Sequence, residues 1–296
     1  MDPRICGLLA SASVEISSSG SQLTELGEYF FAGTEVSITF LPGDNYRHNV
    51  QTAAALRRAG FNPVPHIAAR EMPSRETLDD FLARARSEAD VRRVMLIAGD
   101  VAAAKGPFKS SRDIAASGLL EAHGIASVSV AGYPEGHPYL EGEHAFDALA
   151  AWRDWGKSAG VRVGIVTQFC FESGPILGWL GELATRGIEL PVTVGLAGPA
   201  ALATLAKFGL RCGIGNSMRA LRGQIGRFGR LLTDNGPDDV LRGLAAAPPA
   251  ATAAITGFHL FPFGGLRKAG TWLHDFENEL QATAPRTAPQ NAAQNP

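Results

Sequence analysis

The sequence lacks an excess of charge of either sign. Its 296 residues carry 27 Lys and Arg against 29 Asp and Glu, which gives a formal net charge of -2. Proteins that hold nucleic acid through phosphate contacts usually present a broad basic surface. The balanced charge therefore argues against a nucleic-acid-binding protein.

Long hydrophobic runs are also absent. No stretch of about 18 consecutive apolar residues, the length that crosses a bilayer, occurs in the chain. The first 20 residues hold one Arg and a short apolar stretch that passes directly into polar sequence, which is unlike a secretory signal peptide. We therefore expect no membrane association and a cytoplasmic location.

Cysteine is scarce. The three residues Cys6, Cys170 and Cys212 lie far apart, and no CxxC spacing occurs. An odd number of isolated cysteines is typical of a reducing compartment and argues against a zinc site built on thiolates. We expect no bound metal.

The chain instead contains a regular alternation of two kinds of segment, in a composition that is 45% hydrophobic and typical of globular proteins. Short β-branched runs predict eight strands, at 5–16, 35–40, 63–68, 93–100, 126–133, 164–171, 191–198 and 253–261. Ala- and Leu-rich stretches predict helices at 47–59, 75–88, 112–123, 143–159, 175–186, 199–208, 216–246 and 266–282.

Eight β-α units without a break in composition favour a single α/β domain, a (β/α)8 barrel of the TIM type, over an open doubly wound sheet. We expect this domain to span residues 1–280. The tail 281–296 is rich in Ala, Pro, Gln and Asn and is expected to be disordered. The basic, Gly-broken stretch 211–235 is expected to form an insertion or two helices whose Arg residues face solvent.

Polar side chains follow many of the predicted strands. In such barrels the reacting groups lie at the carboxyl ends of the strands. The candidates there are Glu15, Thr39, His66, Asp100, Tyr133, Glu135, His137, Gln168 and His259. Any one of them could be an ordinary hydrated side chain, but together they would need a shared ligand to satisfy them.

Two strings are the most informative. In VAGYPEGHP (130–138), two prolines fix the backbone and two glycines permit close approach, so that Tyr133, Glu135 and His137 are presented toward a ligand. LIAGD (96–100) ends an apolar strand with the carboxylate of Asp100, whose burial would be costly without a cation, a donor or water. A cationic intermediate would be a natural partner.

These strings resemble the methylenetetrahydrofolate reductases, flavoenzymes on a (β/α)8 barrel that reduce a folate one-carbon unit. VAGYPEGHP is nearly the family's own string. The family motifs Leu-Arg-Gly-Asp, Pro-His, Thr-Gln-Phe-Phe and Phe-Glu-Phe correspond to residues 97–100, 65–66, 167–170 and 14–16, and Phe258-His259 resembles the motif on its last strand. The resemblance covers most of residues 10–265 in unbroken order.

The resemblance implies that Glu15 is the general acid for opening the five-membered ring of methylenetetrahydrofolate and that Asp100 stabilises the iminium cation. It implies that Gln168 holds the folate. It also implies FAD as cofactor, NAD(P)H as hydride donor, and flavin contacts at Thr39, His66, Ala98, Gly99, Asp100, Ser111, Tyr133 and His137. The chemistry independently requires an acid and an anion, since N10 is protonated as the ring opens and positive charge then forms at N5.

Some positions depart from the family pattern. Ala98 replaces the family's Arg, its Asn-x-x-x-Lys pair has only Lys157 as a distant counterpart, and its Gly-Ile-Met-Pro is GLAGP (195–199) here. Two alternatives therefore stay open: direct hydride transfer from NADH to folate without flavin, and a barrel that binds folate without reducing it. No GxGxxG stands in the context of a separate Rossmann site for NAD. The reaction direction, the choice of NADH or NADPH, and a homo-oligomeric state are left open.

Overall fold

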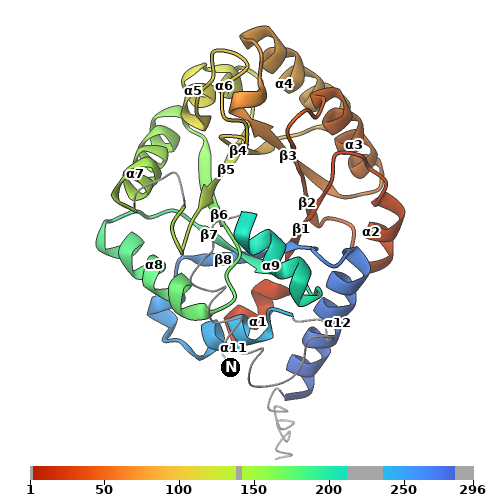
Figure 1. Ribbon diagram of the computed structural model, residues 1–296, viewed down its shortest axis with the longest axis vertical. Helices are drawn as coiled ribbons and strands as arrows, with labels where there is room; N and C mark the ends of the chain where they lie inside the picture. Colours follow the sequence, from red (N-terminus) through yellow and green to blue (C-terminus); the bar gives the residue numbers. More distant parts are fainter. Residues whose placement is uncertain (1–2, 138–141, 212–235, 284–296) are drawn as a thin grey trace, which may run out of the picture.

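Eight parallel strands close into one barrel, in the order in which they occur along the chain (Figure 1). The computed structural model describes residues 3–137, 142–211 and 236–283. The strands are β1 (Ser13–Ile16), β2 (Glu35–Ile38), β3 (Asn62–Ala68), β4 (Arg93–Ile97), β5 (Ser127–Gly132), β6 (Arg162–Thr167), β7 (Val192–Ala197) and β8 (Ile255–Phe261). Pairing of β1 with β8 completes the ring, so the predicted (β/α)8 barrel is confirmed.

Most helices form the outer layer around the strands, and α9 crosses the front of the barrel (Figure 1). The helices are α1 (Pro3–Leu9), α2 (Leu23–Tyr29), α3 (Tyr46–Arg58), α4 (Arg75–Ala89), α5 (Ser111–Ala116), α6 (Leu119–Ala122), α7 (Gly142–Ala159), α8 (Ser173–Thr185), α9 (Leu202–Arg211), α11 (Asp238–Ala246) and α12 (Leu266–Thr283), with 3-10 turns η1 (Ala69–Glu71) and η2 (Pro249–Thr252). The main hydrophobic core lies between this layer and the outward faces of the strands.

Helix α4 shows how the sequence builds this layer. Leu78, Phe81, Leu82 and Ala85 recur on one face and are almost completely buried. The Ser74 hydroxyl accepts a hydrogen bond from the backbone N–H of Thr77 at 3.2 Å and so caps the helix.

The predicted strand 5–16 is wrong in its first half, because residues up to Leu9 form α1. A short apolar run fits a buried strand or a buried helix equally well. Ile5 and Leu9, one helical turn apart, are both buried, and the Arg4 guanidinium donates to the carbonyls of Thr252 and Ile255 at 2.9 Å. These contacts hold α1 against the start of β8. Helix α2 had no counterpart in the prediction.

Further differences concern helix limits. The segment predicted as one helix at 112–123 is divided into α5 and α6 at Gly118, whose φ of 71° is left-handed. The predicted strand 93–100 ends at Ile97. A helix was expected over residues 216–246, and the structure describes its last part as α11; residues 212–235 lie outside the described ranges. Residues 284–296 of the expected tail also lie outside them. None of the helices within the described ranges could cross a membrane.

Candidate active site

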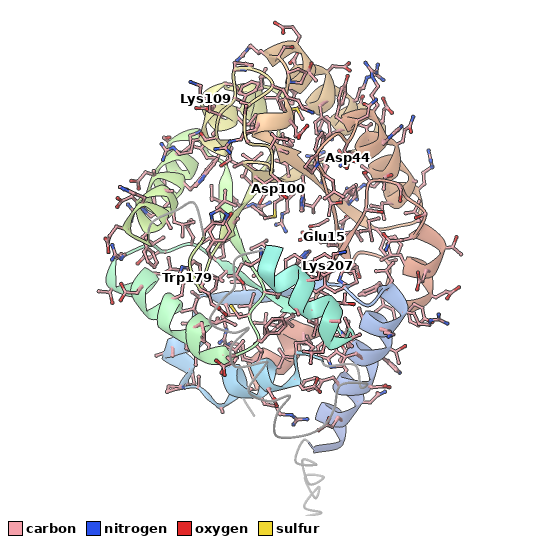
Figure 2. The ribbon with its side chains drawn as sticks, viewed as in Figure 1. Glu15, Asp44, Asp100, Lys109, Trp179 and Lys207 are labelled. Carbon is pink, nitrogen blue, oxygen red and sulfur yellow. The ribbon has the colours of Figure 1, made fainter. Side chains whose placement is uncertain are left out.

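The carboxyl ends of the strands bring most of the predicted site residues to one end of the barrel, here called the mouth. Figure 2, viewed along the barrel, shows Glu15 and Asp100 inside the ring of helices, with Lys109 and Asp44 farther out. The two predicted carboxylates come from β1 and from the segment that follows β4, which are far apart in sequence. Only closure of the barrel places them around one space.

Glu15 and His66 form the centre of the mouth. The Glu15 side chain is about one-fifth exposed, with its Oε2 atom 3.8 Å from Nε2 of His66. Burial raises the pKa of Glu15 from 4.5 to about 7 and lowers the pKa of His66 to about 4. Near neutral pH the pair therefore consists of a carboxyl group poised to give up a proton and a neutral imidazole.

His259 lies deeper, on β8. It is 2% exposed, and its Nδ1 atom is 2.8 Å from the Ser13 hydroxyl. Burial, followed by the neighbouring His66, lowers the pKa of His259 to about 3. Both histidines are thus neutral over the physiological range, and they leave Glu15 as the titrating group of this cluster.

Two buried polar atoms in this region have no hydrogen-bond partner among the described residues. They are Oγ1 of Thr39 and Nε2 of His66. The backbone N–H of Thr39 donates to the carbonyl of Ile16 at 3.0 Å, so Thr39 lies beside the end of β1, close to Glu15 along that strand. A buried polar atom without a partner is costly, and a ligand in the mouth would satisfy both.

The segment after β4 carries Ala98, Gly99 and Asp100. Gly99 has a φ of 93°, and a Cβ atom there would lie 3.3 Å from Cβ of Ala68, so a turn that only glycine adopts easily leads into Asp100. The carbonyl of Ala98 accepts a hydrogen bond from the backbone N–H of Arg70 at 2.9 Å. Asp100 itself is exposed in this structure, on the side of the mouth.

Arg70 fastens the remainder of this loop. Its side chain donates to the carbonyls of Val101 and Lys109, and Lys105 reaches the buried carboxylate of Glu71. These contacts join the loop after β4 to the turn after β3, and the sequence reasoning did not find them. In the sequence, the basic residues of REMP and KGPFK are the only indication of these contacts.

Tyr133 and His137 lie together after β5. Their ring centroids are 4.5 Å apart, and Gly136, with a φ of 85°, makes the turn between them. Burial lowers the pKa of His137, and the negative charge of Asp100 opposes this effect. The two segments follow the neighbouring strands β4 and β5, so Asp100 and His137 lie on the same side of the mouth.

Gln168 follows β6. Its backbone N–H donates to the carbonyl of Gly132 at 2.8 Å, and its side-chain oxygen accepts from the N–H of Phe169. The neighbouring Cys170 is a buried free thiol whose pKa is raised by burial and then by Glu135. The Gln168 residue lies at the mouth after β6, which is separated from β4 by β5 alone.

An aromatic cluster beside Gln168 was missed by the sequence reasoning. It consists of Phe169, Phe171, Phe208, Phe261 and Phe263, with ring centroids 4.2 to 5.8 Å apart. Helix α9 packs on it through Leu202 and Leu205 and crosses the front of the barrel in Figure 1. The alternating aromatics of QFCF and HLFPF were the available signal. The cluster gives the mouth one apolar wall.

Ser111 and Lys157 mark the limits of the site. Ser111 begins α5, and its hydroxyl makes no hydrogen bond with the other described site residues. Lys157 is in the last turn of α7, a helix of 18 residues that starts on the mouth side. At 1.5 Å per residue this helix carries Lys157 to about the opposite end of the barrel, so it is not the missing cation of the mouth.

A flavin would meet suitable groups in part of this site. The unpartnered Thr39 and His66 atoms and the Tyr133–His137 pair offer polar and aromatic contacts for a ring system. Lys109, just before Ser111, is exposed and has no ion pair within the described ranges, so it can meet a phosphate. The residue types present at the mouth therefore fit the group.

Comparison with known families matches residues 23–214 to the family model described as methylenetetrahydrofolate reductase. This span covers well over half of the chain and includes Thr39, His66, Asp100 and Gln168, whereas Glu15 and His259 lie outside it. Among solved structures, the chain is similar to dihydropteroate synthase (FolP) from Thermus thermophilus, with 14% sequence identity and a TM-score of 0.49 over 91% of this chain and 95% of that chain.

Proposed function

The chain belongs to the methylenetetrahydrofolate reductase family, and from this premise we propose that it interconverts 5,10-methylenetetrahydrofolate and 5-methyltetrahydrofolate with NAD(P)H as hydride donor. Family membership makes it an oxidoreductase that acts on folate in one-carbon metabolism. The observation that carries the finer proposal is the Glu15 carboxyl group, with a pKa of about 7, at the mouth of the barrel beside a neutral His66.

Glu15 is proposed as the general acid. Opening of the five-membered ring requires a proton on N10, and an acid works best when its pKa lies near the working pH. Burial gives Glu15 such a pKa. The imidazole of His66 is neutral, so it places no charge beside the Glu15 carboxyl group. Glu15 therefore holds the proton until the folate nitrogen takes it.

Asp100 is proposed as the anion that stabilises the iminium form of the substrate. Ring opening leaves positive charge at N5 and its methylene carbon before hydride arrives. A carboxylate fixed by the Gly99 turn and the Arg70 contacts would oppose this charge without rearranging, which is the condition for strong electrostatic stabilisation. Gln168 and the adjacent aromatic wall are proposed to hold the pterin.

FAD is proposed as the cofactor. When bound, it would supply a two-electron carrier between NAD(P)H and folate. The chain would hold it through Thr39, His66, Ala98, Gly99, Asp100, Ser111, Tyr133 and His137, with Lys109 at a phosphate. The unpartnered polar atoms of Thr39 and His66 support this assignment because they need a ligand.

Direct hydride transfer from NADH to folate is the second candidate. Ala98 lacks the cationic side chain found in the family, and the position of Lys157 in α7 removes the only other counterpart named from the sequence. The visible spectrum of the purified protein separates the two. Absorption bands of a bound flavin support the first candidate, and NADH-dependent turnover by a colourless protein supports the second.

The proposed activity is tested with methylenetetrahydrofolate and with NADH and NADPH in turn, in the presence and absence of added FAD. Methyltetrahydrofolate is the expected product. Glu15→Gln should reduce turnover by more than about 10²-fold while substrate binding persists, because the amide keeps the shape but cannot donate the proton. Glu28→Gln, which changes an exposed carboxylate of α2, is the matched control.

Two outcomes would contradict the proposal. Turnover of Glu15→Gln within about tenfold of wild type would remove Glu15 as the acid. Folate binding without any product, under every cofactor condition, would instead indicate a barrel that binds folate without reducing it.

A further inference from the structure

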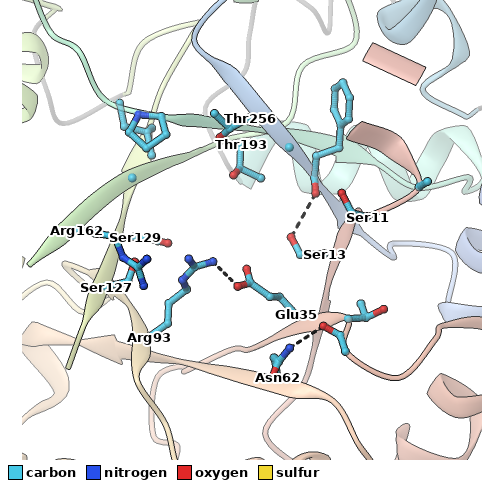
Figure 3. Close-up of a pocket in the computed structure, with 18 of the residues that line it drawn as sticks. Ser11, Ser13, Glu35, Asn62, Arg93, Ser127, Ser129, Arg162, Thr193 and Thr256 are labelled. Carbon is cyan, nitrogen blue, oxygen red and sulfur yellow. Dashed lines mark hydrogen bonds and ion pairs between the residues drawn. The ribbon is translucent and has the colours of Figure 1, made fainter. Parts of the chain in front are cut away.

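The amino-terminal half of the barrel is hollow. (β/α)8 barrels normally fill their interior with layers of bulky branched side chains. Here, small or hydroxyl-bearing residues line a cavity of about 690 Å³ (Figure 3). They include Ser13, Ser127, Ser129, Gly164, Thr193 and Gly257.

The cavity opens at the end of the barrel opposite Glu15. Its lining includes the first residue of each of the strands β1 to β6, from Ser13 on β1 to Arg162 on β6, together with residues 31–34 just before β2. All these positions lie at the amino-terminal face of the parallel barrel. This face is distinct from the mouth that holds the proposed folate site.

Closely packed residues lie between the cavity and the mouth on several strands. On β7, Thr193 lines the cavity and Gly195 follows two residues later on the same face. A Cβ atom at Gly195 would lie 2.3 Å from the carbonyl oxygen of Thr167 and 2.7 Å from the Phe261 ring. Met95 and His259 are also buried in the strands here. These residues pack between the cavity and the mouth on the strands that carry them.

Packing does not require the glycines that keep the cavity open. A Cβ atom at Gly164 would meet Pro191 at 3.5 and 3.6 Å, and one at Gly257 would meet Thr193 at 3.7 and 3.8 Å, which are ordinary van der Waals distances. Neither glycine has a left-handed φ. Larger residues would fit and would stabilise the barrel by filling it, so the open volume is a feature that packing alone does not explain.

The charges on the lining favour an anion. Arg93 is paired with Glu35, as the dashed line in Figure 3 shows, whereas the Arg162 guanidinium has no partner within the described part of the chain. One uncompensated positive charge therefore faces the opening. A guanidinium binds carboxylate and phosphate oxygens through two parallel N–H groups.

Further groups in the lining provide donors and one aromatic surface. The hydroxyls of Ser127, Ser129 and Thr193 make no hydrogen bond with any other described residue. At the rim, Phe31 is 77% exposed and is one of two large apolar side chains found exposed in the described ranges. Phe31 precedes β2 and Arg162 begins β6, so the exposed ring and the cation stand on opposite sides of the opening. A ligand that spans the opening could therefore carry an acidic group at one end and an apolar or aromatic part at the other.

We propose that this cavity is a second binding site, which takes a small organic anion with one carboxylate or phosphate group and an aromatic ring. Arg162 binds the acidic group, the three hydroxyls hydrogen-bond to it, and Phe31 covers the ring. The site goes beyond the folate chemistry at the mouth and does not depend on it. Its volume is in the range of pockets that enclose small ligands.

The experiment is calorimetric titration of the purified full chain with three anionic probes, which are phenyl phosphate, benzoate and inorganic phosphate, and with neutral benzyl alcohol. We expect saturable binding of phenyl phosphate or benzoate. The probe with the higher affinity shows whether the site prefers a phosphate or a carboxylate. Arg162→Gln should weaken binding by about tenfold or more, which corresponds to the loss of one charge-assisted contact. Arg58→Gln, at an exposed arginine of α3, is the control and should leave binding unchanged.

Gly257→Val gives an independent test, because its side chain would occupy the cavity. It should abolish binding while the thermal midpoint stays the same or rises. Amide NMR shifts of the wild-type chain provide a measurement that needs no variant, and phenyl phosphate should shift signals of residues 31–35 and 127–129. Three outcomes would overturn the proposal: shifts confined to residues 98–100 and 133–137, binding of benzyl alcohol as tight as that of the anions, or no saturable binding of any anionic probe. Each of them counts against the second site whether or not the protein turns over folate.

Discussion

At the scale of single residues, the mouth is controlled by how burial changes acid-base behaviour. Glu15, His66 and His259 are each shifted toward the neutral form, since all three lie in a water-poor interior. The shifts have opposite signs for the carboxyl group and the imidazoles. A neutral cluster with one readily released proton results.

The raised pKa of Glu15 predicts a pH-dependent stability. The folded chain binds this proton more tightly than the unfolded chain, so the stabilisation is complete below about 4.5 and is lost as pH rises through about 7. His66 and His259 behave oppositely: their stabilisation is complete above about 6.5 and is lost as pH falls from there through about 4 and about 3. In the folded chain, Glu15 is the group of this cluster that titrates between pH 6 and 8, and the contribution of the two histidines cancels when wild type is compared with a variant at Glu15.

Glu15→Gln should therefore gain in unfolding free energy relative to wild type as pH rises from about 6 to 8, by roughly 1 to 1.5 kcal/mol. Urea denaturation at several pH values measures this difference. Glu28→Gln should show no such trend, because its carboxylate is exposed. A difference that stays constant with pH would mean that Glu15 is not held in its neutral form.

Asp100→Asn tests the proposed anion. Loss of the carboxylate should slow folate reduction by roughly 10² to 10³, whereas reduction of the cofactor by NAD(P)H should change far less because no cation forms in that step. Rapid mixing separates the two half-reactions. Asp147→Asn, at an exposed position of α7, serves as control. Equal slowing of both half-reactions would assign Asp100 a role in supporting the loop rather than in stabilising the cation.

At the scale of elements, the segment between β4 and α5 matters most for the site. It leaves the strand through the Gly99 turn and is then held by Arg70, Lys105 and the capping box of Ser110 and Asp113. Because these contacts are short-range and numerous, the segment can fix a carboxylate at the mouth without belonging to the strand.

Gly99→Ala should disturb this segment. A side chain at a φ of 93° is strained by about 1 to 2 kcal/mol, and its contact with Ala68 adds to the cost. We expect a lower thermal midpoint together with reduced turnover. Gly178→Ala, at an exposed position of α8 with open space around it, should be neutral or stabilising by up to about 1 kcal/mol. An unchanged midpoint for Gly99→Ala would show that the turn adapts.

At the scale of the whole molecule, α1 holds the amino-terminal end of the chain to the last strand. Arg4 makes three hydrogen bonds to η2 and β8, at 2.9, 2.9 and 2.7 Å, across about 250 residues of sequence. Arg4→Met should lower the free energy of unfolding by roughly 1 to 3 kcal/mol. Urea denaturation should show a lower midpoint with an unchanged slope, and Arg58→Met should leave both unchanged. A wild-type midpoint for Arg4→Met would mean that α1 is held by its apolar face alone.

The sequence by itself determined the barrel and most of the mouth. Strand and helix periods differ, so eight alternating units were visible without coordinates, and parallel strands necessarily place Glu15, Asp100 and Gln168 at the same end. The assignment of residues 5–9 to a strand failed because a short apolar run has no period long enough to distinguish the two states.

The tertiary structure decided what depends on distance and exclusion of water. The pKa values of Glu15 and His66 follow from how deeply each is buried, the Arg70 contacts from loops that meet in space, and the aromatic wall from the packing of α9 on β6 and β8. The cavity in the amino-terminal half of the barrel is likewise decided by the tertiary structure. Serine and glycine in single strands signal nothing unusual, and only closure of the barrel sums their small volumes into one cavity.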